Sequence, residues 1–253
     1  MNIFYALIMG VLQGLTEFLP VSSSGHLVLF SRITGITSSL YYDLILHLGS
    51  LFAVLIFERK QVLDIIRHPL CKKSKFLFVS CIFTVVIVLV FSGLIPSSFE
   101  GNALPFCFLV TAIVLFLGEK FPKSNAKSLS YASAITLGVA QGLAVFPGVS
   151  RSGTTYSVGN ALGLEKEENL NFCFLLSVPV ILGGALLSIL SSSAVEVSFL
   201  CLLVGFCASF ISAFCSLKLI NKVFLGKGFT PFVVYLSLLS VFLTLNNFVF
   251  HLF

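Results

Sequence analysis

Residues 10–26 read GVLQGLTEFLPVSSSGH, and residues 138–154 read GVAQGLAVFPGVSRSGT. Ten of these 17 positions are identical at a constant shift of 128 residues. The same shift places Asp43 on Asn171 and Leu48 on Leu176 without a gap. A repeat of this length predicts that two halves of the chain, 1–127 and 128–253, share one architecture.

The composition is that of an integral membrane protein. Apolar residues make up 57% of the chain and charged residues 10%, and the mean hydropathy is +1.07. These values exclude an ordinary water-soluble domain. Long uncharged stretches can each cross about 30 Å of hydrocarbon as a helix. They are residues 76–99, 101–118, 169–195, 197–217 and 228–253. The period-two alternation of a membrane β-barrel is missing, so we expect an all-α fold.

Each half is predicted to contain five helices. The expected ranges are 3–19, 22–34, 42–58, 75–95 and 104–119, then 130–146, 150–163, 170–191, 197–219 and 230–251. At about 1.5 Å per residue, the second helix of each half is too short to cross a bilayer. Pro20, Pro147 and nearby glycines let the chain reverse. We therefore expect re-entrant hairpins over 3–34 and 130–163, and three transmembrane helices in each half. Three crossings invert the second half, which gives an inverted-topology repeat within a single membrane domain, 1–253.

Charge gives an independent prediction of orientation. Thirteen of the 15 Lys and Arg residues fall in connections that share one side of the membrane if the N-terminus is outside: 59–75, 120–127, 166 and 218–227. Basic residues prefer cytoplasmic connections. We therefore expect both termini outside. The net charge of +5 then reflects orientation and contact with anionic headgroups, not nucleic-acid binding.

Polar residues gather at the two predicted hairpin tips. Glu17 and Arg151 are expected at bilayer depth, where a charge costs at least about 2.5 kcal/mol and persists only if it is paired or hydrated. One interpretation is a buried ion pair that locks the hairpins together. The other is a binding site, which also accounts for polar residues that a lock does not need: Gln13, Ser22, Ser23, Ser24, His26, Ser150, Ser152, Thr154 and Thr155.

These residue types fit a phosphate ligand. The serine runs begin helices, whose free N–H groups and positive dipole end attract anions, and the Arg151 guanidinium matches phosphate oxygens. We expect phosphate to contact Ser22, Ser24, Ser150, Ser152, Thr154 and Thr155. Gln13 and Glu17 are four residues apart on one helical face, where their oxygens would hold Mg²⁺ or Ca²⁺.

The predicted reaction is phosphoryl transfer, with Glu17, Ser23, His26 and Arg151 as the catalytic residues. The cation, the guanidinium and the helix N-termini would neutralise charge on the phosphoryl oxygens. Three attacking groups stay open: Ser23 activated by His26, a cation-activated water, and His26 itself. His47, on a spanning helix, is expected to make a structural hydrogen bond or to support the site.

The stretch from Gln13 to Leu27 resembles the first motif of the undecaprenyl-diphosphatase (bacitracin-resistance) family, an E/Q-x-x-x-E pattern followed by serines, and Pro147 to Thr155 resembles its second motif. The likeness covers the whole chain. It implies an enzyme of the bacterial plasma membrane that removes the terminal phosphate of undecaprenyl diphosphate with a divalent cation. This reaction recycles the lipid carrier of cell-wall synthesis, and bacitracin would compete for the substrate.

The resemblance also implies a set of site residues. These are Glu17, Ser23, His26, Ser150, Arg151 and Thr155. Gln13 stands where many relatives have a glutamate, which leaves Glu17 as the main anionic metal ligand. The resemblance and a lipid substrate exposed after glycan transfer favour a site that opens toward the outer face.

A transporter or flippase of a phosphorylated lipid or anion is the competing hypothesis, because inverted repeats with broken helices also build transporters. The two tips differ in chemistry at three aligned positions: Glu17 with Val145, Ser23 with Arg151, and His26 with Thr154. One tip would then supply the acid and the base, and the other the anion clamp. This division of roles favours hydrolysis over transport.

Overall fold

The computed structural model describes residues 2–36, 39–94, 102–120, 127–191, 197–224 and 228–252, and within them it is helical, without a β-strand. The helices of the first half are α1 (Ile3–Phe18), α2 (Ser23–Thr34), α3 (Leu40–Phe57), α4 (Arg59–Arg67), α5 (Lys72–Val90) and α7 (Leu104–Lys120). Those of the second half are α8 (Tyr131–Leu143), α9 (Arg151–Ala161), α10 (Lys166–Ser191), α11 (Phe199–Lys222) and α12 (Thr230–Leu245), which continues as the π-helical turn η2 (Asn246–Phe250). The all-α class predicted from the sequence is confirmed.

All ten helices expected from the sequence occur, and α4 is an addition. It lies in the basic connection expected between two spanning helices. Long uncharged stretches predict the other helices, whereas α4 mixes four charged with four apolar residues over nine positions. An amphipathic pattern of this kind forms a helix at a surface rather than across a bilayer.

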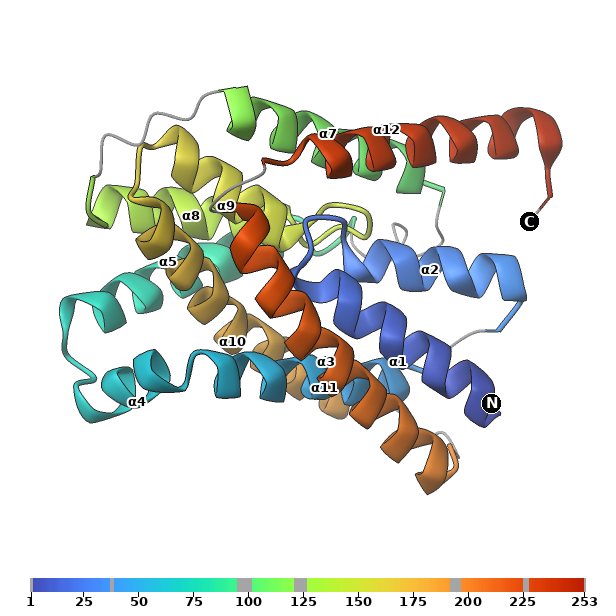
Figure 1. Ribbon diagram of the computed structural model, residues 1–253, viewed down its shortest axis with the longest axis horizontal. Helices are drawn as coiled ribbons and strands as arrows, with labels where there is room; N and C mark the ends of the chain where they lie inside the picture. Colours follow the sequence, from blue (N-terminus) through green and yellow to red (C-terminus); the bar gives the residue numbers. More distant parts are fainter. Residues whose placement is uncertain are drawn as a thin grey trace.

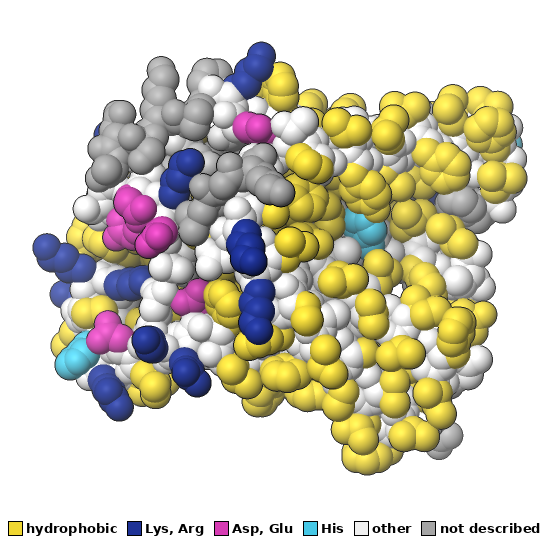
Figure 2. Space-filling view, viewed as in Figure 1, with side chains coloured by type: hydrophobic (Ala, Val, Ile, Leu, Met, Phe, Trp, Pro, Cys, Tyr) yellow, Lys and Arg dark blue, Asp and Glu magenta, His cyan; other side chains and the backbone are white. Residues whose placement is uncertain are grey.

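Three helices in the described part of the chain are long and apolar enough to cross a membrane: Lys72–Val90, Phe199–Lys222 and Thr230–Phe250. A fourth candidate combines Tyr41–Phe57 with Arg59–Arg67, which meet at an angle of 81°. The surface agrees with this assignment. In the view of Figure 2, apolar side chains cover the right-hand part of the molecule, and charged side chains gather at the left. These features identify a membrane protein.

The loops that follow α1 and α8 reverse the chain and meet near the middle of the molecule (Figure 1). α2 and α9 begin directly after these loops, each with a serine at its N-cap. The Ser22 side chain accepts a hydrogen bond from Gly25 N, and the Ser150 side chain accepts one from Gly153 N. These caps fix where each short helix starts, so the N-termini of both helices lie at the meeting point.

Glycines at matching positions of the two halves allow close helix packing. A Cβ atom at Gly14 of α1 would overlap Ser212 Oγ and Ser209 O of α11, and a Cβ at the matching Gly142 of α8 would overlap the Ile87 side chain of α5. Small residues at such contacts let two backbones approach in a membrane protein. α1 therefore packs along α11 much as α8 packs along α5.

We predict that Gly14→Ala destabilises the protein by about 1–3 kcal/mol, because the added methyl group overpacks the contact with α11. Gly183→Ala is the matched control, since no atom lies within 4 Å of its added Cβ. Thermal unfolding in detergent, followed by circular dichroism, measures both. An unchanged unfolding temperature for Gly14→Ala would contradict this helix contact.

Candidate active site

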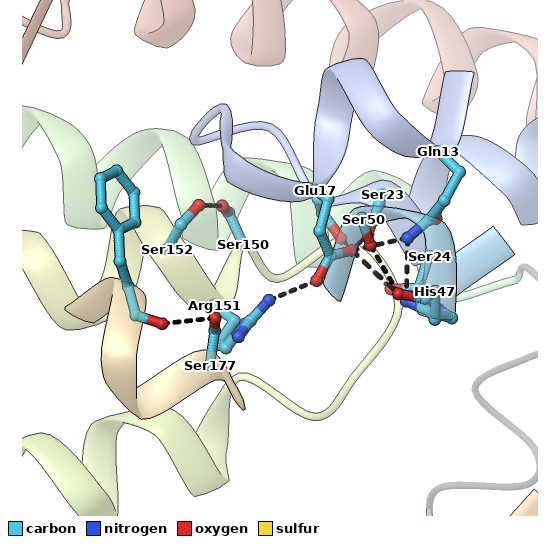
Figure 3. Close-up of polar contacts among 12 residues, drawn as sticks. Gln13, Glu17, Ser23, Ser24, His47, Ser50, Ser150, Arg151, Ser152 and Ser177 are labelled. Carbon is cyan, nitrogen blue, oxygen red and sulfur yellow. Dashed lines mark hydrogen bonds and ion pairs between the residues drawn. The ribbon is translucent and has the colours of Figure 1, made fainter. Parts of the chain in front are cut away.

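Glu17 is the centre of a hydrogen-bonded cluster between the two hairpin tips (Figure 3). Its side chain is only 4% exposed. Oε2 accepts hydrogen bonds from Gln13 Nε2 at 2.8 Å and from Ser23 Oγ at 2.6 Å. Oε1 forms an ion pair with Nη2 of Arg151. The structure thus joins the acid of the first repeat to the guanidinium of the second.

Local structure explains how these side chains reach one another. Glu17 lies in the last turn of α1, Ser23 is the first residue of α2, and Arg151 is the first residue of α9. The reversal between α1 and α2 passes through Ser22, whose φ of 71° lies in the left-handed region. This conformation is costly for a residue with a side chain and is most often found where surrounding contacts hold it in place.

Hydrogen bonds in both directions hold the tips together. Gly148 N donates to Ser22 Oγ at 3.0 Å, and Ser152 Oγ donates to Leu19 O at 3.2 Å. A Cβ at Gly25 would lie 2.6 Å from Gly148 N, so the contact requires glycine there. The two serines therefore position the tips against each other.

An open cavity of about 770 Å³ lies beside this contact. Its polar lining comes from both hairpins, α1–α2 and α8–α9, and from α3 and α5: Glu17, Ser22, Ser23, Ser24, Ser31, Arg32, Asp43, His47, Thr84, Gln141, Ser150 and Arg151. Its apolar lining includes Leu27, Val28, Leu44, Val88, Val145, Val149, Val180 and Ile181. A cavity with a polar end and apolar walls suits an amphiphilic ligand.

The structure brings most of the predicted site residues to this cavity, but not all of them. Those at its lining are Glu17, Ser22, Ser23, Ser24, Ser150 and Arg151. Gln13 lies behind Glu17 and is fully buried. Ser152 joins the tips, and Thr155 Oγ1 donates to Arg151 O at 2.8 Å within α9. Thr154 is buried, and its hydroxyl has no partner in the described chain.

His26 faces away from the cavity and is not part of its lining. Its Nδ1 lies 2.7 Å from Ser22 O, and its Nε2 lies 2.7 Å from the Tyr235 hydroxyl. A carbonyl oxygen only accepts, so Nδ1 carries the proton, and in the neutral ring Nε2 accepts from the hydroxyl. The ring also stacks on Tyr235 and meets Phe108 edge-on. Both nitrogens are therefore engaged in this structure.

His47 is the imidazole that reaches the cavity. Gln13 Nε2 lies 2.8 Å from His47 Nδ1, and this nitrogen is 3.5 Å from Glu17 Oε2. The Glu17 carboxylate accepts hydrogen bonds, so the amide nitrogen of Gln13 must face it, and the second N–H then donates to Nδ1. The His47 proton consequently lies on Nε2. His47 therefore supports the site, as one of its two expected roles, by accepting from Gln13, which in turn donates to the central carboxylate.

Three buried polar atoms near the tips have no hydrogen-bond partner in the described chain: Arg151 Nη1, Gln13 Oε1 and Gln141 Oε1. Such atoms are costly unless a ligand, ion or water satisfies them. The guanidinium N–H can donate to an anion. The two amide oxygens can accept from water or contact a cation.

Gln141 was not selected from the sequence, although a signal for it existed. It is identical to Gln13 across the repeat shift, it lines the cavity, and its Nε2 donates to Thr84 Oγ1 at 3.2 Å. Identity between the two copies at a polar buried position was the clue. Asp43, Thr84 and Arg32 also reach the lining, but nothing in their own sequence neighbourhood indicated this.

A family profile described as "Bacitracin resistance protein BacA" matches residues 6–242 of the chain. The chain belongs to this family. Among its relatives, the undecaprenyl-diphosphatase of Carboxydothermus hydrogenoformans is 38% identical over 250 residues, which cover 95% of this chain and 96% of that protein. The undecaprenyl-diphosphatase of Methanosphaera stadtmanae is 34% identical over 266 residues, covering 95% and 96%. That of Thermosipho africanus is 35% identical over 243 residues, covering 93% and 96%.

The Ser22 hydroxyl offers a test of the tip contact in this BacA-family protein. Ser22→Ala removes the acceptor for Gly148 N and keeps the backbone strain, so we expect a loss of about 1–3 kcal/mol in stability. Ser22→Gly removes the same acceptor but tolerates positive φ, so it should lose measurably less. Chemical or thermal unfolding in detergent compares them. Equal losses would show that φ at this position carries no strain.

Proposed function

We propose that the protein is an integral membrane phosphatase that hydrolyses undecaprenyl diphosphate to undecaprenyl phosphate and inorganic phosphate. One observation carries the proposal: a single cavity combines a buried carboxylate, a guanidinium with an unpartnered N–H and the N-termini of two helices. Membership of the BacA family and relatives named undecaprenyl-diphosphatase support it. The reaction recycles the lipid carrier of cell-wall synthesis and confers bacitracin resistance, and bacitracin competes for the same lipid.

The terminal phosphate binds against the second tip. Arg151 Nη1 and the free N–H groups at the start of α9 and α2 donate to its oxygens, and these donors neutralise charge as it grows in the transition state. Ser24 lies beside them on the cavity lining. Ser22 and Ser150 act through the helix caps, because their oxygens already accept backbone N–H groups.

Ser23 is our first choice of attacking group. Its hydroxyl donates to Glu17 Oε2 at 2.6 Å, so that carboxylate can take the proton as Ser23 Oγ bonds to the terminal phosphorus. The bond from phosphorus to the bridging oxygen then breaks, undecaprenyl phosphate leaves, and water releases phosphate from the serine. A water attacking directly is the second choice. His26 holds the first tip in place through its hydrogen bonds with Ser22 O and the Tyr235 hydroxyl.

A divalent cation, Mg²⁺ or Ca²⁺, fits this site if the substrate completes its coordination. Glu17 would hold it, and the Gln13 amide would turn its oxygen Oε1 toward the carboxylate to supply a second ligand. No group of three His, Cys, Asp or Glu side chains in the described chain forms a metal cage, and Mg²⁺ commonly binds one or two carboxylates together with substrate phosphates. When bound, the cation supplies positive charge next to the phosphoryl oxygens.

The proposed topology is an inverted repeat with two re-entrant hairpins and three crossings in each half. The pairing of α1 with α11 and of α8 with α5 supports the duplication. The charged side chains at one end of the molecule (Figure 2) support a cytoplasmic end there. The termini then lie outside, in the plasma membrane, and the cavity opens toward the outer face.

We predict that Glu17→Ala and Arg151→Ala each lower phosphate release from undecaprenyl diphosphate by on the order of 10²–10³-fold, because the first removes the proton acceptor and cation ligand and the second removes a positive charge that stabilises the transition state. Purified protein in detergent, with a colorimetric phosphate assay, measures this. Gly93→Ala, which lies outside the cavity lining and whose added Cβ meets no atom within 4 Å, should retain full activity. Lipid binding and transport without phosphate release by the unmodified protein would indicate a carrier instead.

The attacking group is tested by Ser23→Ala. If Ser23 forms the bond to phosphorus, turnover falls by at least about 10²-fold, and mass spectrometry of the unmodified protein quenched during turnover finds phosphate on this residue. Undiminished turnover in Ser23→Ala would eliminate the serine and leave water as the attacking group.

The cation site is tested by Gln13→Glu. A second carboxylate beside Glu17 should lower the half-saturating Mg²⁺ concentration by roughly tenfold, since ligand charge sets cation affinity. Gln141→Glu is the matched control, because it adds the same charge at the equivalent position of the other repeat. Phosphatase activity and thermal stability, each measured as Mg²⁺ is added, both report Mg²⁺ binding. An unchanged Mg²⁺ requirement in Gln13→Glu would place the cation elsewhere.

A further inference from the structure

α4 differs from the other helices because none of its residues is buried. It follows α3 directly after Glu58 and is bent away from that helix by 81°. α5, a candidate membrane span, begins only a few residues later at Lys72. If α3 crosses the membrane, α4 therefore runs close to the membrane plane between two spanning helices.

The outward side of this segment is a narrow apolar ridge, formed by Leu63, Ile66 and Leu70. These side chains are 47%, 67% and 80% exposed. Leu63 and Ile66 are three residues apart and share one face of α4, and Leu70 follows in the turn after the helix. At about 100° per residue, Arg59 and Arg67 project within roughly 40° of Leu63, one on each side. The ridge is thus bordered by positive charge.

The opposite side of α4 is fixed by hydrogen bonds. Gln61 Nε2 donates to Glu58 Oε2 at 2.7 Å, and Lys73 Nζ donates to Gln61 Oε1. Glu58 is buried at the bend. These contacts tie α4 to the ends of α3 and α5, so the helix cannot rotate to bury its ridge against the protein.

We propose that α4 is an interfacial anchor that inserts its ridge among the acyl chains and binds anionic phospholipid headgroups through Arg59, Lys60 and Arg67. Four charged side chains in nine residues exclude α4 from the hydrocarbon core. The exposed ridge is unfavourable in water. An apolar face bordered by Lys and Arg is typical of helices that lie in the interface.

Charge favours anionic lipid as the occupant rather than a soluble partner or a second copy of the chain. In Figure 2, basic side chains gather at the end of the molecule where Figure 1 places α4. The cytoplasmic leaflet carries negative lipids, and each Lys or Arg near such a surface raises the association constant of the segment with the membrane by about fivefold. A second copy would present the same positive border and repel it.

The absence of tryptophan from the sequence makes this proposal directly measurable. Ile66→Trp creates a single fluorophore on the ridge of the full-length protein. In phosphatidylcholine nanodiscs with a minor fraction of brominated lipid, its emission should be blue-shifted and quenched by bromine. Brominated phosphatidylglycerol should quench it at least twice as strongly as brominated phosphatidylcholine at the same fraction.

Two matched variants separate headgroup binding from lipid contact. Ile113→Trp, on α7 and 49% exposed, lies far from basic residues along its helix and should be quenched equally by both lipids. Replacement of Arg59, Lys60 and Arg67 by Gln in the Ile66→Trp protein should keep the quenching and remove the preference for phosphatidylglycerol.

Three results would overturn the proposal. Emission of Ile66→Trp that iodide quenches and brominated lipids do not would place α4 in water. A blue shift that depends on protein concentration, without quenching by bromine, would indicate a second copy on the ridge. Equal quenching by both brominated lipids would show that the basic border selects no headgroup. None of these readouts depends on phosphatase activity.

Discussion

The ion pair between Glu17 and Arg151 is the constraint on which the site depends. Two charges taken out of water are stable only when they meet and when further donors satisfy the remaining lone pairs. Glu17 meets this condition through Gln13, Ser23 and Arg151. The two residues are far apart in the chain, so the pair can form only if the two hairpin tips converge. The glycines and serines at the tips permit that convergence.

The duplicated tips have diverged in chemistry while keeping their backbone role. Ser22 and Ser150 still cap α2 and α9 through the same side-chain hydrogen bond, which each accepts from the backbone N–H three residues later. The residue that follows is Ser23 in one copy and Arg151 in the other, which places a hydroxyl and a guanidinium at the two helix starts. A symmetric pair of tips would provide two clamps or two acids. The asymmetric pair provides one acid and one anion clamp, which suits a group-transfer reaction better than simple passage of a lipid.

The all-α class and the ten helices could be predicted from the sequence, because long apolar stretches and the repeat can be read from it directly. The meeting of Glu17 with Arg151 could be predicted because a charge at bilayer depth needs a partner. The sequence did not predict α4, since charged residues hide this helix from a search for long apolar stretches. The sequence also did not predict that His26 lies outside the cavity lining or that His47 is part of it. Both depend on packing between helices distant in sequence, where Tyr235 and Gln13 supply the partners. The inverted orientation of the halves stays a prediction.

A double-mutant cycle on Glu17 and Arg151 tests the central claim most directly. Glu17→Gln and Arg151→Met should each destabilise the protein by about 3–5 kcal/mol, because each leaves a buried charge without its partner. The double variant should lose far less than the sum, with unfolding measured in one detergent under identical conditions. Losses that add to within about 0.5 kcal/mol would show that the two side chains do not interact, and the shared site between the tips would be contradicted.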